Sequence, residues 1–208
     1  MRGLLALSRA IDALNGQIGR AVGILIFAAV VVSSANAVVR YIFDTSSNAW
    51  LELQWYLFAA VFMLGSGYTL LSNEHVRIDI IVGRLSHRKR AWIDLIGGLL
   101  FLLPMTLVIG WFSWPFFAKS IAGCHFLGAP VSDLLGWALP GQSGTDCEIS
   151  SDAGGLIRWP AKILIPIGFV LLALQGISEI IKRIAFLIGA GPDPLVTEGE
   201  HHGEPISD

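Results

Sequence analysis

Four long apolar runs, separated by shorter polar segments, dominate the hydropathy pattern of this chain. They cover roughly residues 21–39, 50–71, 91–117 and 159–181, and none carries more than two charged side chains. A transmembrane helix needs about 20 mostly apolar residues, and backbone groups inside lipid must be paired within their own segment. The pattern therefore predicts an all-α membrane protein in which a single domain, residues 1–190, forms four transmembrane helices.

The residues before the first run have a periodicity of their own. Their apolar positions recur at spacings of three and four: Leu4, Leu7, Ile11, Leu14 and Ile18. This spacing predicts an amphipathic helix that lies in the membrane interface ahead of the first span. The Ala35-Asn36-Ala37 pattern offers the alternative of a signal-peptide cleavage site. A secretory leader has no need of the preceding amphipathic helix, so we expect the segment to be retained.

Basic residues predict the orientation. Ten Lys and Arg residues flank the runs on one side of the membrane, and four lie on the other side: Arg40, Lys119, Arg158 and Lys162. Because Lys and Arg concentrate on the cytoplasmic side, we expect both termini in the cytoplasm and an outer loop at residues 118–158. The tail, residues 191–208, is rich in Pro, Gly and Glu, and we expect it to be an acidic, disordered segment.

Composition agrees with a membrane protein. Of the 208 residues, 54% are hydrophobic and 14% are charged, whereas soluble domains carry about 25% charged residues. The net charge of −2 leaves no basic excess to neutralise phosphates, which excludes nucleic acid as a partner. Membrane lipid is the expected environment.

The two cysteines, Cys124 and Cys147, both fall in the predicted outer loop. That side of the membrane is oxidising, so we favour a disulfide between them, with free thiols as the alternative. A redox-active pair would have a closer spacing such as C-x-x-C. We therefore predict a structural bond and no catalytic role.

Polar residues interrupt the apolar pattern at both ends of the second run. Glu52 lies about one turn inside it, where a carboxylate in lipid is costly and should face protein or snorkel to water; Arg40 is a candidate partner. At the other end, the segment NEHVRID carries His75 and Asp79. If the helix continues there, these two side chains lie one turn apart and can pair.

Neither polar place predicts a metal or cofactor site. A metal site needs three or four ligands, and His87 is twelve residues from His75. A b-type haem would need histidines near the middle of a run, and none lies there. We therefore predict no catalytic, metal-binding or cofactor-binding residues, and we interpret the polar positions as helix boundaries and partner-docking residues: Arg40, Trp50, Glu52, His75, Arg77 and Asp79.

Several motifs resemble the small membrane subunit of tripartite ATP-independent periplasmic (TRAP) transporters, the DctQ-like family. They are RYIF after the first run, NAWLELQWYLFAAVFMLGSGYTL in the second, and NEHVRIDII at its end. The block GGLIRWPAKILIPIGFVLLALQGISEIIKRI is similar to the branch whose loop between spans three and four is extended. Many members have two adjacent acids after the tryptophan, whereas Glu52 is the only acid at this place here.

The resemblance implies that three proteins act together in transport. A periplasmic substrate-binding protein captures an organic (carboxylic or 2-oxo) acid, and a large permease subunit moves it inward by symport with sodium. This chain would be the small permease subunit, a non-enzymatic scaffold in the bacterial inner (plasma) membrane. The alternatives are a membrane redox or quinone-interacting protein, which would carry bound haem or quinone, and a freestanding channel, which would conduct without a partner.

Overall fold

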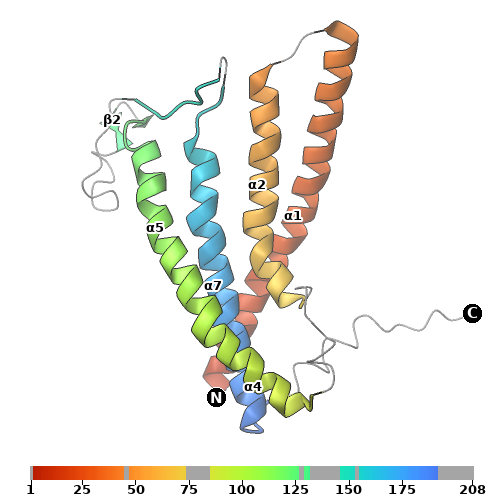
Figure 1. The fold of residues 1–208 in the computed structure, drawn as a ribbon, viewed down its shortest axis with the longest axis vertical. Coiled ribbons are helices and arrows are strands. Elements are labelled where there is room, and N and C mark those ends of the chain that lie inside the picture. Colours follow the sequence, from red (N-terminus) through yellow and green to blue (C-terminus); the bar gives the residue numbers. More distant parts are fainter. Residues whose placement is uncertain are drawn as a thin grey trace, which may run out of the picture. The chain divides into compact units, whose positions relative to one another are not determined.

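The computed structural model describes residues 2–44, 47–73, 85–126, 129–131, 146–152 and 155–191. Long helices make up most of this part of the chain (Figure 1). In chain order the elements are α1 (Arg2–Phe43), α2 (Asn48–Leu71), α4 (His87–Gly97), the π-helical turn η1 (Gly98–Leu102), α5 (Leu103–Ile121), β1 (His125–Phe126), β2 (Ala129–Pro130) and α7 (Trp159–Leu187). The strands form an antiparallel pair with His125 opposite Pro130. The predicted helical fold is confirmed, with this two-residue pair as an addition.

Three helical stretches among the described residues are long and apolar enough to cross a membrane: Arg2–Phe43, His87–Ile121 and Trp159–Leu187. They contain the predicted first, third and fourth spans. The helix α2 has nearly the bounds predicted for the second span, but it is not one of the three, because Glu52, Gln54 and the Gly-Ser-Gly at 65–67 interrupt its apolar sequence. The fourth crossing therefore remains a prediction. The expected disordered tail lies outside the described residues from 192 onward.

The first helix differs from the expected interfacial helix followed by a separate span. It runs without a break over 42 residues, because it contains no proline, and an interior glycine costs a helix only about 1 kcal/mol. Its first turns bury a mainly polar face: Ser8, Ile11 and Asn15. Leucines that were predicted to form the apolar face remain exposed: Leu4, Leu7 and Leu14.

Contacts divide the chain into two compact units, and each long helix contributes to both. The first unit comprises Met1–Gly19, Ser66–Leu107 and Val170–Asp208, and the second comprises Arg20–Gly65 and Val108–Phe169. Each unit has its own polar cluster, so the two are described separately below.

Glycines allow close helix packing within each unit. In the second unit, a Cβ at Gly168 of α7 would lie 2.7 Å from the backbone oxygen of Met63 on α2. In the first unit, a Cβ at Gly19 of α1 would overlap the ring of Tyr68 on α2. Small residues at helix contacts are typical of membrane proteins, where close packing replaces the hydrophobic effect as the source of helix association.

Large apolar side chains cover much of the helix exterior. In the second unit the most exposed include Phe27, Phe62, Trp111 and Phe112, each at least 70% exposed. By contrast, polar side chains such as Asn15, Gln175 and Ser178 are completely buried in the first unit. Polar groups inside and apolar groups outside are the arrangement that lipid or apolar partner helices stabilise.

Candidate functional site

Glu52 is the charged side chain that the sequence placed inside the second apolar run, and it lies in the second turn of α2. It is only 5% exposed. Its Oε2 atom accepts a 2.6 Å hydrogen bond from the backbone N–H of Leu156, and the Ser150 hydroxyl donates a further hydrogen bond to the carboxylate. The loop before α7 therefore satisfies this carboxylate, where the sequence had offered Arg40 as the candidate partner.

The backbone around Glu52 is shaped to fit the carboxylate. A Cβ at Gly155 would lie 2.9 Å from Oε1 of Glu52, so glycine at this position allows the loop to approach closely. One turn further along α2, the Tyr56 hydroxyl donates a 3.1 Å hydrogen bond to the carbonyl oxygen of Ile157. We call Glu52 and Tyr56 the α2 anchor, since both hold the segment 155–157.

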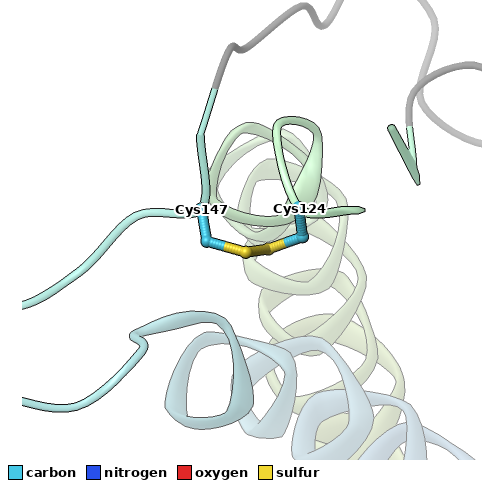
Figure 2. Close-up of a disulfide and its surroundings, with 2 residues drawn as sticks. All are labelled: Cys124 and Cys147. Atoms are coloured by element: carbon cyan, nitrogen blue, oxygen red, sulfur yellow. A yellow bond between two sulfur atoms is a disulfide. The ribbon is translucent and has the colours of Figure 1, made fainter. Parts of the chain in front are cut away.

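The same loop is tied to the end of α5. Cys124, which follows α5, and Cys147 form a disulfide (Figure 2), as predicted from their shared position in the loop. The bond is covered by an apolar cluster that includes Ala118, Val131 and Trp159. A disulfide that closes a loop of this length is worth about 3 kcal/mol in the chain-entropy model.

An ion pair fastens the loop to the first turn of α7. The Nζ atom of Lys162 donates a short hydrogen bond to the Glu148 carboxylate, and Arg158 lies 3.8 Å from the other carboxylate oxygen. Lys162 also lies over the Phe116 ring, 4.1 Å from its centroid, in cation–π geometry. The Lys162 hydrogen bond, together with the positive charges of Lys162 and Arg158, lowers the pKa of Glu148 below its ordinary value, and burial of the carboxylate offsets this shift only in part.

A second polar cluster, which the sequence reasoning missed, joins α1 and α7 in the first unit. Asn15 donates a 2.8 Å hydrogen bond to the side-chain oxygen of Gln175, and the hydroxyls of Ser8 and Ser178 lie 2.7 Å apart. Asp12 accepts hydrogen bonds from Ser178 at 2.7 Å and from Gln175 at 2.9 Å. We call these five residues the α1–α7 network.

Charged groups continue this network toward the end of α7. Lys182 pairs with Asp12 at 2.9 Å and with Glu179 at 2.6 Å. Arg183, which is 3% exposed, lies 3.4 Å from Asp94 on α4 and 3.3 Å from Glu179. A cavity of about 300 Å³ adjoins this charge cluster and is also lined by Gly97 and Ile180.

A spacing signal for the α1–α7 network was present in the sequence. Ser8, Asp12 and Asn15 recur at four and three on one helix, and Gln175, Ser178, Glu179 and Lys182 recur at three, one and three on the other. Residues three and four apart share one face of a helix. The polar residues of the N-terminal segment were assigned to the water-facing side of an interfacial helix, and their match with α7 was therefore overlooked.

The six predicted docking residues have different outcomes. Glu52 is buried, whereas Arg40 at the end of α1 is exposed and Trp50 is 52% exposed. His75, Arg77 and Asp79 lie outside the described residues. Among the residues that the structure describes, no three His, Cys, Asp or Glu side chains are arranged to hold a metal ion. The polar clusters found here have structural roles. The contacts of Glu52, Tyr56 and Glu148 hold the loop to helix ends, and the α1–α7 network holds one helix to another.

Comparison with protein families decides the identity of the chain. The family described as "Tripartite ATP-independent periplasmic transporters, DctQ component" matches residues 29–186, which is most of the sequence. The chain belongs to the DctQ family. No curated protein and no solved structure matches it.

Family membership shows that both clusters belong to a component of a TRAP transporter. DctQ is the small permease component of TRAP transporters. The matched region contains the α2 anchor, the disulfide and the α7 side of the network, while the network's α1 side precedes it. Membership thus identifies the component, and the contacts described above show how this member is held together.

Proposed function

We propose that this DctQ component is a scaffold for the large TRAP permease subunit in the bacterial inner membrane. In this role it supports the uptake of an organic acid that a periplasmic binding protein delivers and that an ion gradient drives. The family match carries the proposal. The exposed apolar helix faces support it, because such faces need either lipid or the helices of a partner.

We further propose that the chain crosses the membrane four times with both termini in the cytoplasm. The distribution of basic residues supports this orientation. It places the Cys124–Cys147 disulfide on the oxidising side, where disulfides persist. In this orientation the loop that the α2 anchor holds faces the periplasm.

The substrate class is proposed from the extended loop before α7. This loop resembles the branch of the family associated with carboxylic or 2-oxo acids, and sodium is the coupling ion that the family resemblance implies. Substrate choice should then follow the binding protein and the large subunit. This chain does no chemistry in the proposal.

Assembly is proposed to use the helix exterior together with the predicted docking residues. Arg40 in the last turn of α1 and Trp50 in the first turn of α2 are exposed and are available to a partner. His75, Arg77 and Asp79 are proposed to contact the permease at the cytoplasmic end of the second span. A charge that is paired in an assembled interface and left unpaired by mutation costs several kcal/mol.

Co-purification tests the scaffold. The large permease subunit from the same transporter is expressed with and without this chain, solubilised in mild detergent and captured through a tag on the large subunit. We expect a stable complex, with less large subunit recovered when two exposed aromatic residues of α5, Trp111 and Phe112, are both replaced by alanine. Full recovery of active large permease in the absence of this chain would contradict the scaffold role.

A further inference from the structure

Residues 148–152 and 155–158 form two short antiparallel segments between the disulfide and α7. The backbone N–H of Arg158 donates to the carbonyl of Glu148 at 2.9 Å, and that of Ser150 donates to the carbonyl of Leu156 at 3.0 Å. Between these bonds, Ile149 and Ile157 pair in an antiparallel bridge. We call these two segments, residues 148–152 and 155–158, the 148–158 hairpin.

The hairpin is fixed on three sides within its unit. The disulfide at Cys147 joins it to the end of α5, and the Glu148–Lys162 ion pair joins it to α7. The α2 anchor holds its other strand through Leu156 and Ile157. A loop held at three helix ends keeps one orientation, because each anchor removes conformations that the others leave open.

The hairpin presents an apolar pair that no described contact covers. Ile149 is 59% exposed and Ile157 is 42% exposed. Residues directly opposite each other on antiparallel strands have Cβ atoms about 4.5–5.5 Å apart, so the two side chains form one small surface. Burying these isoleucines against a partner is favourable, because it removes apolar surface from water.

We infer that the 148–158 hairpin is a contact surface for the periplasmic binding protein, and that Glu52 is a positioning residue which holds this surface in place. This inference rests on the proposed function. The disulfide supports the periplasmic side, which is where a soluble partner can reach the hairpin. The small area suits a partner that must leave after each delivery, because transient complexes have the smaller interfaces. The large subunit, a permanent partner, has the long apolar helix faces available instead.

Glu52 itself does not contact the binding protein in this proposal. The carboxylate is buried against Leu156, so it contacts the hairpin backbone and leaves Ile149 and Ile157 exposed. Replacing Glu52 by alanine leaves the Leu156 N–H without its acceptor. Replacing it by glutamine keeps a carbonyl oxygen for that bond, and this variant is expected to lie between alanine and the wild type.

The test is binding-protein-dependent uptake by the full complex in proteoliposomes, at increasing concentrations of substrate-loaded binding protein. The double variant Ile149→Ser with Ile157→Ser should raise the half-saturating concentration by about five- to tenfold, the effect of losing a central apolar contact. The maximal uptake rate should stay within about twofold. Ile188→Ser, which removes an isoleucine that is 61% exposed just after the end of α7, serves as the matched control and should leave both values unchanged.

Glu52 variants add a readout that a general loss of stability would not produce. Glu52→Ala should raise the half-saturating concentration as the double variant does, and amide exchange at Leu156 should become faster, with Glu52→Gln intermediate in both. An unchanged half-saturating concentration in the isoleucine variant would overturn the inference, and so would a fall in maximal rate and complex recovery together. If wild-type uptake does not require this chain, the proposed function fails instead, which separates the two outcomes.

Discussion

Asn15 and Gln175 are 160 positions apart in the sequence, yet the side-chain amide of Asn15 donates a 2.8 Å hydrogen bond to the side-chain oxygen of Gln175. Both side chains are completely buried. The bond holds the N-terminal part of α1 against α7, so this segment belongs to the helix packing of the first unit.

A double-mutant cycle measures the strength of this contact. Asn15→Ala and Gln175→Ala should each destabilise the protein, because each leaves a buried polar group without its partner. Interhelical hydrogen bonds in membrane proteins are worth about 0.6 kcal/mol on average and about 1.7 at most, so the coupling energy should fall in that range. Unfolding in mixed micelles provides the measurement, with exposed Gln17→Ala as the control. Strictly additive effects would contradict the contact.

The close approach of α2 and α7 at Gly168 predicts that alanine is destabilising there, whereas it is tolerated at an open glycine on α1. Gly168→Ala places a methyl group against the Met63 backbone and should cost about 1–3 kcal/mol through overpacking. Gly23→Ala on α1 meets nothing within 4 Å, so its higher helix propensity should leave stability unchanged or raise it by up to about 1 kcal/mol. Thermal unfolding of the two variants in the same detergent checks this. A Gly168→Ala variant as stable as the wild type would contradict the close approach at Gly168.

Sequence reasoning predicted the helices well because apolar length determines them. The apolar runs at 91–117 and 159–181 lie within the stretches His87–Ile121 and Trp159–Leu187. The disulfide was also predictable, because the two cysteines share one predicted outer loop. Helix ends were less predictable, since polar turns extend a helix beyond the hydrocarbon without any apolar signal.

Pairings between distant residues could not be predicted in the same way. Glu52 was recognised as costly in lipid, but the sequence does not indicate that Leu156, 104 positions away, would supply its hydrogen bond. The α1–α7 network was missed because a polar helix face can meet water or a second polar face, and the pattern is the same in both cases. Only the spacing on the second helix distinguishes the two.

Protonation of Glu148 should loosen the hairpin. Its pKa is lowered in the folded protein, first by the Lys162 hydrogen bond, so the ionised form is the one that folding stabilises. The contribution is complete above the ordinary pKa of 4.5, and it is lost as the pH falls through the lower folded value. The rate at which a phosphine reduces the Cys124–Cys147 bond should therefore rise below about pH 4.5, beyond the reagent's own pH dependence. Glu148→Gln should react fast at every pH, and a wild-type rate without this rise would contradict the prediction.

Orientation can be read from two introduced cysteines. Ser151→Cys, in the 148–158 hairpin, should react with a membrane-impermeant maleimide in intact spheroplasts. Ser86→Cys, just before α4, should react only after the membrane is permeabilised. The native cysteines are bonded to each other, so they do not compete for the reagent. Labelling of Ser86→Cys in intact spheroplasts would reverse the proposed topology.

Uptake by reconstituted vesicles tests the scaffold proposal most directly. Vesicles are prepared with the large permease subunit alone, with this DctQ component alone, and with both, and each is supplied with substrate-loaded binding protein and an inward sodium gradient. The account predicts solute uptake only when both membrane components are present, with the solute determined by the binding protein and the large subunit. Uptake by this chain alone, or full uptake by the large subunit without it, would contradict the account.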